Sequence, residues 1–311
     1  MTREPVNVDN FARAETNRMF AALQRPAINV WRHDRTLGSL DDQTVIRQNR
    51  DTLYSAVIAD ISQGATLTIL DAGDRYLSVM VVNQDHYINR IFHGAGEYEL
   101  TVDEFDTPYV LLAARILVDP DDDADLAAVN ALQDGLGLSA RSAVPFVMPD
   151  YDEASFTSTR EALLQLASGI GGFTGAFGPR DRVDPIKHLL GTAAGWGGLP
   201  SEEATYLNAG GLPVGEYEVT VEEVPVDAFW SLSVYNADGF FEPNELGRNN
   251  VNSVTATRND DGSITVRFGT AGGDQPNYIP ITEGWNYLVR LYRPRPEVLD
   301  GSWTFPAAVP V

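Results

Sequence analysis

Short strand-like apolar segments occur in two blocks of the chain, and they restrict it to a β-rich fold. The first block includes TLYSAVIADI, RYLSVMVVNQ and PYVLLAARILV, and the second includes GEYEVTVEEV, AFWSLSVYN and NYLVRLYRP. Gly, Asp and Pro separate these segments at short intervals, a pattern typical of antiparallel sandwiches and barrels. The sequence therefore predicts a mainly β, α+β chain with two antiparallel β-sandwich or jelly-roll-like domains.

Helical patterns lie between the two blocks and at the N-terminus. DPDDDADLAAVNALQDGLG, SFTSTREALLQLASGI and part of VDPIKHLLGTAAGWGGLP have helical character, and acids near the start of the first of them suit the helix dipole. VNVDNFARAETNRMFAALQR predicts a leading helix with Asp9 or Asn10 as its cap. We therefore expect an N-terminal β domain with its helix at 1–120, a helical connecting segment at 121–206 and a C-terminal β-sandwich at 207–311.

The overall charge excludes some classes of partner. The 311 residues carry a net charge of −22, which repels phosphate backbones and disfavours nucleic acid and anionic membranes as partners. The chain has no cysteine, so disulfides, thiolate catalysis and cysteine metal sites are excluded. The N-terminal stretch has no apolar signal core, and no run approaches 18 apolar residues. We expect a cytoplasmic protein that binds a small molecule and can form a homo-oligomer.

One stretch carries more hydrogen-bonding groups than a core strand needs. In VIRQNRDTLYSAVIAD, a continuous strand would place Asn49 and Asp51 on one face and Arg50, Thr52 and Tyr54 on the other. Polar groups at the start of a strand that becomes apolar indicate a strand entering a core from a cleft. The alternative is a polar turn, in which Asp51 accepts backbone hydrogen bonds and Arg50 pairs with an acid.

A histidine at a strand end is another candidate. His86 follows the apolar run YLSVMVV, and strand ends often carry functional groups. His86 and His93 are an odd number of residues apart, so a continuous strand points them to opposite faces and disfavours a shared metal site. A lone histidine is also often structural, and both roles stay open for His86.

The C-terminal block supplies polar residues within apolar strands. Tyr235, in FWSLSVYN, shares a strand face with Ser231 and can pack and hydrogen-bond. Arg290, in NYLVRLYRP, is costly to bury without a partner, so it either pairs with an acid such as Asp51 or binds an anionic ligand. Arg248, in NELGRNN, is a candidate anion binder on a loop.

Common cofactor motifs are not found. The sequence has no G-x-S-x-G, G-x-G-x-x-G, P-loop or H-E-x-x-H pattern, and its four histidines lack ligand spacing. We therefore expect no organic cofactor and no tightly bound transition metal.

Several motifs in order resemble one bacterial family. QNRDTLYSAVIADIS, RYLSVMVVNQDHY, AFGPRDRVDPIKHLLGTAAGWGGLP, FWSLSVYN, NDDGSITVRFG and YLVRLYRP resemble proteins that combine domains of unknown function 1254 and 1214. That family's N-x-D-T-L-Y-S motif matches Asn49 and the residues from Asp51 to Ser55, whereas its N-W-L-P motif reads NYIP here. The resemblance implies two β-sandwich-like domains joined by a helical segment, and it implies little about activity. Many relatives are exported, and we expect this chain to lack their leader.

Three functions remain open from sequence. The first is a small-molecule enzyme without an organic cofactor, hydrolase- or lyase-like, acting in a cleft between the N-terminal motif strand and the C-terminal sandwich. The second is a non-catalytic binding or accessory module for a carbohydrate or organic acid, and the third is a structural or assembly protein. The candidate catalytic residues are Asp51, His86 and Tyr54. The candidate ligand-binding residues are Asn49, Arg50, Thr52, Tyr235, Arg248 and Arg290.

Overall fold

The chain divides into two compact units that are not continuous in sequence. The computed structural model describes residues 3–43, 46–271 and 273–311, so Val45, the first residue of the motif stretch, lies outside the described residues. Unit 1 comprises Met1–Arg35, Leu53–Leu117 and Asp123–Pro200. Unit 2 comprises Thr36–Thr52, Val118–Asp122 and Ser201–Val311.

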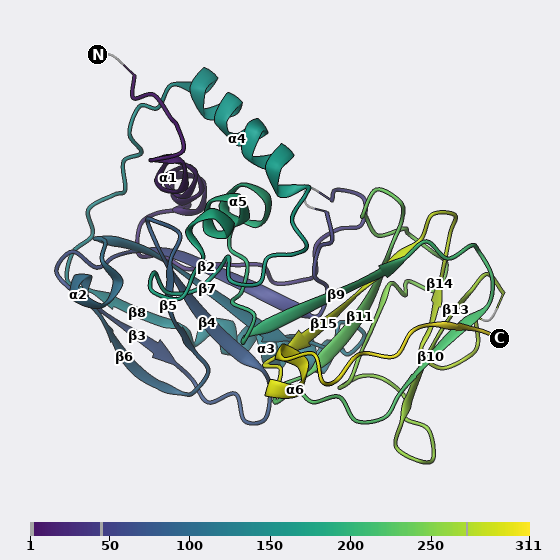
Figure 1. Ribbon diagram of the computed structural model, residues 1–311. Helices are drawn as coiled ribbons and strands as arrows, with labels where there is room; N and C mark the ends of the chain where they lie inside the picture. The colour runs from purple at the N-terminus through teal and green to yellow at the C-terminus, as the bar shows by residue number, and fades with distance from the viewer. Residues whose placement is uncertain (1–2, 44–45, 272) are drawn as a thin grey trace. The chain divides into compact units, whose positions relative to one another are not determined.

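Unit 1 contains an antiparallel five-stranded sheet and a smaller three-stranded sheet (Figure 1). The larger has the order β1-β2-β7-β4-β5, with bounds Arg32–His33, Thr52–Asp60, Tyr109–Leu117, Leu77–Asn83 and Ile88–Phe92. The smaller has the order β6-β3-β8, with bounds Gly96–Leu100, Ala65–Ile69 and Gly137–Ala140. The central strand β4 is buried along its whole length, which explains its continuous apolar run in place of alternation.

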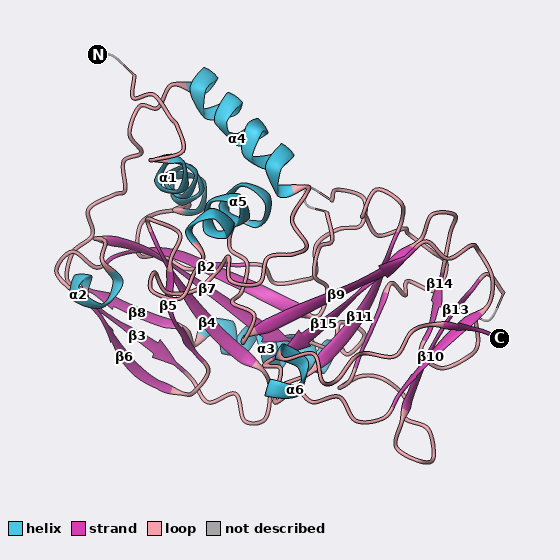
Figure 2. Cartoon of the chain, viewed as in Figure 1, coloured by secondary structure: helices cyan, strands magenta, loops and turns pink. Residues whose placement is uncertain are grey.

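Five of the described helices belong to unit 1. They are α1 (Phe11–Leu23), α2 (Val102–Phe105), α3 (Asp123–Asp134), α4 (Glu153–Ala167) and α5 (Pro185–Gly195). Helices α1, α4 and α5 gather on one side of the larger sheet (Figure 2) and share a small apolar cluster that includes Phe11, Leu163 and Leu190. Asn10 precedes α1 as predicted, but its side chain makes no capping hydrogen bond. Among the described residues, no helix has the length and apolar character needed to cross a membrane.

Unit 2 is a sandwich of two four-stranded sheets. One has the order β14-β13-β10-β16, with bounds Tyr278–Pro280, Ile264–Gly269, Tyr217–Val221 and Val309–Pro310. The other has the order β12-β11-β15-β9, with bounds Asn250–Asn252, Trp230–Tyr235, Asn286–Tyr292 and Ala204–Gly210. The pairs are antiparallel except β13 with β14, and the short helix α6 (Pro296–Leu299) follows β15.

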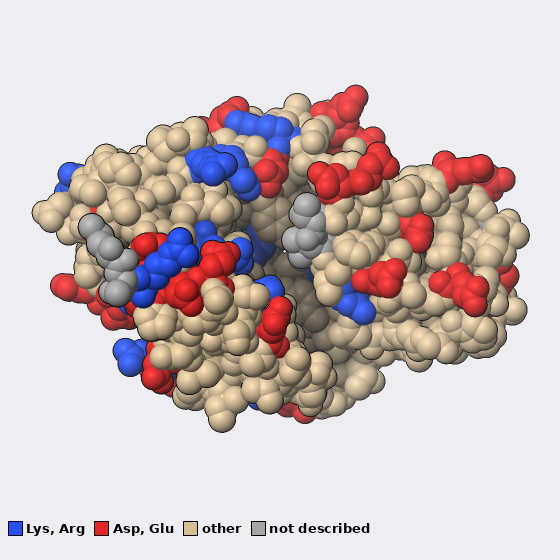
Figure 3. Space-filling view, turned by 90° about the horizontal axis from the view of Figure 1, so that it is seen from above, with Lys and Arg blue, Asp and Glu red and all other residues tan. Residues whose placement is uncertain are grey.

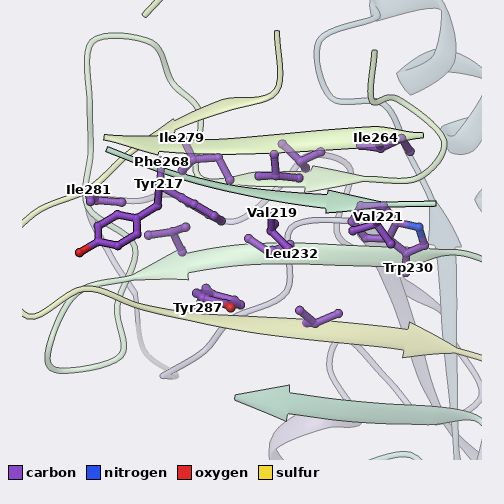
Figure 4. Close-up of a cluster of buried hydrophobic side chains, with 14 of the residues drawn as sticks. Tyr217, Val219, Val221, Trp230, Leu232, Ile264, Phe268, Ile279, Ile281 and Tyr287 are labelled. Atoms are coloured by element: carbon purple, nitrogen blue, oxygen red, sulfur yellow. The ribbon is translucent and has the colours of Figure 1, made fainter. Parts of the chain in front are cut away.

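Side chains from both sheets fill the space between them (Figure 4). Trp230, Leu232 and Val234 of β11 point into this core, where they join β10 and β13 residues such as Val219 and Phe268. Because successive strand residues point to opposite faces, the alternate residues of β11 point out of the core. The second face of β11 is therefore available for other contacts.

The predicted fold class is confirmed as mainly β with several antiparallel sheets. The continuous strand considered for the motif stretch does not form before Thr52, where β2 begins. Arg47 to Asp51 instead form a turn and an irregular segment that belong to unit 2. Most of the segment predicted as a helical connector, 121–206, lies within unit 1 and includes strand β8, and the division at 120 and 206 stays a prediction.

Leu232→Ala tests the sandwich core. Leu232 has no exposed surface, so the substitution leaves a cavity between the sheets and should lower the free energy of unfolding by about 2–5 kcal/mol. Glu222→Ala, at an exposed position next to β10, should change it by less than about 0.5 kcal/mol. Urea unfolding followed by tryptophan fluorescence measures both, and equal effects would contradict the assigned faces of the sheet.

Candidate functional site

A row of polar side chains crosses the second face of the sheet β12-β11-β15. Ser231 of β11 pairs with Asn252 of β12 on one side and with Arg290 of β15 on the other. All three are buried, with exposed fractions of 3% or less. They alternate with the apolar residues of the sandwich core, so they point away from it. Buried polar groups need hydrogen-bond partners, and the segment Thr36–Thr52, which belongs to the same unit, supplies several.

Asp51 lies over this polar row with no exposed surface. Asn250 Nδ2 donates to Asp51 Oδ1 at 2.9 Å, whereas Asp51 Oδ2 has no hydrogen-bond partner. The hydroxyl of Ser231 also has none. The backbone of Asp51 is fixed on both sides, since its N–H donates to Asn49 Oδ1 at 2.8 Å and its carbonyl accepts from Val118 N at 3.0 Å. The carboxyl is therefore held in place with one oxygen unused.

Burial raises the pKa of Asp51 above its ordinary value. The charge of Arg290 and the polar side chains of Ser231, Asn250 and Asn252 act in the opposite direction because they favour the carboxylate, but burial outweighs them. Ser231 exerts this influence without a hydrogen bond of acceptable geometry, since its hydroxyl and Asp51 Oδ2 are both unpaired. Asp51 thus keeps its proton to a higher pH than an exposed aspartate.

Arg290 fastens the irregular segment to the sheet. Its Nη2 donates to the carbonyl of Arg47 at 2.7 Å and to the hydroxyl of Tyr235 at 2.7 Å, and its Nη1 donates to Ser233 Oγ at 2.9 Å. The Tyr235 hydroxyl in turn donates to the carbonyl of Gln48 at 2.8 Å. Arg290 uses these donors within the protein. Of the two roles considered from sequence, pairing with Asp51 or binding an anionic ligand, the structure describes no direct pair, and Arg290 acts on Asp51 through its charge.

The other motif residues of unit 2 stabilise the same segment. Asn49 Nδ2 donates to Thr52 Oγ1 at 3.1 Å and to the hydroxyl of Tyr292 at 3.0 Å. Arg50 Nη1 donates to the carbonyl of Gly38 at 2.8 Å, and burial lowers the pKa of Arg50. These contacts shape the irregular segment from within. They differ in detail from the polar turn considered from sequence, since Arg50 donates to a main-chain carbonyl and Asp51 accepts from an asparagine side chain.

His86 lies in unit 1, at the turn after β4. It has no exposed surface, and burial together with the neighbouring His188 holds its pKa well below the ordinary value. Gly197 N donates to His86 Nε2 at 2.9 Å, so Nε2 lacks a proton and Nδ1 carries it. His86 Nδ1 lies 2.7 Å from Thr192 Oγ1, which donates to the carbonyl of His188 at 2.8 Å. Both ring nitrogens of His86 are thus engaged by the protein.

Two further candidates from the sequence are Tyr54 and Arg248. Tyr54, on β2 of unit 1, is half-buried with the guanidinium of Arg115 5.5 Å from its ring centroid. Arg248 is exposed on the loop before β12, where its backbone hydrogen-bonds the side chain of Asn244.

Sequence analysis missed the hydrogen-bond partner of Asp51, Asn250, and two other polar side chains that act on its pKa, Ser231 and Asn252. A signal for them exists in the sequence, since NVN places two asparagines on one face of a short strand and Ser231 shares a face with Tyr235. In the described parts of the chain, no three His, Cys, Asp or Glu side chains form a group able to hold a metal ion. The expectation that no transition metal binds stays a prediction.

Tyr235→Phe tests the network that holds the segment. The change leaves the carbonyl of Gln48 with only the 3.2 Å hydrogen bond from Arg290 Nη2, and it removes the Tyr235 hydroxyl as an acceptor for Arg290, so the free energy of unfolding should fall by about 1–3 kcal/mol. Tyr278→Phe is the matched control, because the Tyr278 hydroxyl is buried without a partner and its removal should be neutral or stabilising. Denaturant midpoints measure both, and a neutral Tyr235→Phe would contradict the assigned role.

Solved structures similar to this one have no function stated in their names. The VPA0106 protein of Vibrio parahaemolyticus aligns with a TM-score of 0.77 and 17% identity, over 98% of this chain and 97% of its own. An uncharacterised protein of Burkholderia cenocepacia aligns with a TM-score of 0.54 and 12% identity, over 97% of this chain and 86% of its own. At these identities the likeness concerns the fold alone. No curated protein matches the chain.

One family model matches part of the sequence. Residues 212–296 match the model described as a protein of unknown function, DUF1214. The matched range contains β10 to β15, and therefore the strands that carry Ser231, Asn250 and Arg290. The C-terminal part of the resemblance noted from sequence is thus supported by a family match, with Asp51 outside the matched range.

Proposed function

We propose that the protein is a small-molecule enzyme that needs no organic cofactor and performs hydrolase- or lyase-like proton transfer through Asp51. The observation that carries this proposal is a fully buried carboxyl with one oxygen bound by Asn250 and the other unpaired. Buried unpaired acceptors are rare in folded proteins, and they often mark functional positions.

Stability alone does not account for an aspartate here. An unpaired buried acceptor costs about 1–3 kcal/mol. An asparagine of the same shape would still accept from Asn250 and could donate its amide to Ser231. A residue that lowers stability, at a position where another residue of the same shape would not, is typical of functional sites. This argument favours an active role for Asp51 over a packing role.

The surroundings of Asp51 suit a group that gains and loses a proton. Its raised pKa favours the neutral acid, which can donate a proton from Oδ2 to a leaving group. The charge of Arg290 then stabilises the carboxylate that remains. We assign the proton transfer to Asp51 alone, because both ring nitrogens of His86 are engaged. Since Asp51 is fully buried, a substrate reaches it only when the residues that cover it move aside.

A structural function is the second candidate, and one observation favours it. Arg290 donates to the carbonyl of Arg47 and to the Tyr235 hydroxyl, and this hydroxyl donates to the carbonyl of Gln48. The donors of these hydrogen bonds are all directed to protein acceptors. On this alternative the polar row only anchors the irregular segment. The role of Asp51, which lies outside this set of hydrogen bonds, separates the two functions.

Asp51→Asn should become more stable relative to the wild type as pH rises. In the unfolded chain the aspartate loses its proton near its ordinary pKa of about 3.9, whereas the folded chain keeps it to higher pH. The folded wild type therefore binds more protons above about pH 4, and its stability falls as pH rises. The asparagine has no such dependence. Urea unfolding of both proteins between about pH 4 and 8 measures the difference.

Asp261→Asn is the control, because its stability relative to the wild type should change with pH in the opposite direction. Hydrogen bonds from Ser263 hold the pKa of Asp261 below its ordinary value, so this exposed carboxylate stabilises the fold at neutral pH and loses that effect in acid. The asparagine variant should be slightly less stable than the wild type at neutral pH and approach it at low pH. If the stability of Asp51→Asn relative to the wild type changes with pH in the same direction as that of Asp261→Asn, Asp51 is a stabilising carboxylate and the enzyme proposal fails.

Activity gives the direct test. We expect the wild type to turn over a compound in a panel of esters, lactones and hydroxy acids. Asp51→Asn should lower that turnover by about 100-fold or more, the usual contribution of a general acid, while its melting temperature is kept or raised. Asp261→Asn should retain turnover. An Asp51→Asn protein that keeps its turnover, or loses it only with its fold, contradicts the proposal.

A further inference from the structure

An open hollow of about 160 Å³ lies in unit 1, beside α1 and the start of α4. Its lining combines charged and apolar side chains: Arg3, Arg18, Met148, Pro149, Asp150, Tyr151, Glu153 and Phe156. Basic and acidic side chains occur side by side on part of the face that Figure 3 shows. Two arginines and two acids line the hollow, so an anion meets less repulsion there than the net charge of −22 alone would give.

The guanidinium of Arg18 is fixed by contacts within the protein, but one of its nitrogens remains free to donate. Its Nε and Nη2 donate to the carboxylate of Glu15 at 2.9 and 2.6 Å, and Glu15 is buried. The guanidinium carbon also lies 5.6 Å from the ring centroid of Phe156. Nη1 makes no hydrogen bond among the described residues. A guanidinium fixed by two hydrogen bonds and a ring loses little entropy when it binds a further acceptor.

Tyr151 offers a second donor to the hollow. Its hydroxyl oxygen accepts from Asn17 Nδ2 at 2.9 Å, which fixes the position of the oxygen. The hydroxyl proton has no acceptor among the described residues, so it can be donated to a ligand. Met148, which is 41% exposed, and Phe156 provide an apolar wall beside these donors.

We propose that this hollow binds a small monocarboxylate that carries a flat apolar group. The carboxylate accepts from Arg18 Nη1 and the Tyr151 hydroxyl, and the apolar group packs on Phe156 and Met148. Arg3, Asp150 and Glu153 also line the hollow, and Arg3 Nε lies 3.6 Å from Asp150 Oδ1. With Arg18 the lining carries two positive and two negative side chains, so it offers little excess positive charge for a dianion and favours a monoanion over inorganic phosphate. The inference is independent of Asp51 and of the activity proposed for it.

The test is calorimetric titration of the full chain with 3-phenylpropionate, with phosphate and phenethylamine as comparison probes. We expect saturable binding of 3-phenylpropionate with Kd near ~1 mM, and weaker binding of both other probes. Arg18→Met should weaken it about tenfold, since it removes a charge-assisted hydrogen bond. Arg160→Met is the matched control, because Arg160 also lies 3.8 Å from Glu15 but does not line the hollow. It should leave the Kd within about twofold.

Tyr151→Phe keeps the Arg18–Glu15 pair, so it tests the site even if Arg18→Met fails to fold. It should weaken 3-phenylpropionate binding about three- to tenfold through loss of one neutral hydrogen bond. Three outcomes would each overturn the proposal: no saturable binding of 3-phenylpropionate to the wild type, unchanged affinity in Tyr151→Phe, or phenethylamine binding as tightly as 3-phenylpropionate.

Discussion

The hydrogen bonds from Arg290 to the backbone of Arg47 and to Tyr235 are the interaction on which the candidate site depends. A buried guanidinium must satisfy its donors within the protein, and here main-chain carbonyls of a distant segment accept them. The segment is thereby held on the polar face of β11 and β15. Asp51 owes its burial to this arrangement, and its raised pKa follows from that burial.

Burial acts on Asp51 and His86 with different results. It disfavours the charged form of each, so the pKa of the acid rises and that of the imidazole falls. His86 has a hydrogen bond at each ring nitrogen and is fully satisfied in its neutral form. Asp51 has an unpaired oxygen in the same kind of environment. Hydrogen bonding, rather than burial or pKa shift, therefore distinguishes a candidate reactive group from a structural one.

Strand parity allowed part of this structure to be predicted. The sequence placed Ser231 with Tyr235 and placed Arg290 within an apolar strand, because side chains alternate with a period of two. The sequence left a continuous strand and a polar turn open for residues 47–51. The strand pattern could not decide between them, because Asn49 accepts from the Asp51 backbone and forms a local turn that such a pattern does not reveal. The pairing of Asp51 with Asn250 joins residues 199 positions apart, and no local pattern predicts such a contact.

The discontinuity of unit 2 has a consequence for biosynthesis. Residues 36–52 leave the ribosome long before β11 and β15 are translated, so the segment has no polar sheet face to dock on during most of elongation. Its side chains, Asp51 included, stay hydrated in that interval, and the aspartate then ionises like any exposed one. Completion of β15 brings Arg290 to the segment and removes Asp51 from water. The unusual proton affinity of this carboxyl is therefore acquired only after the last strands of the chain are made.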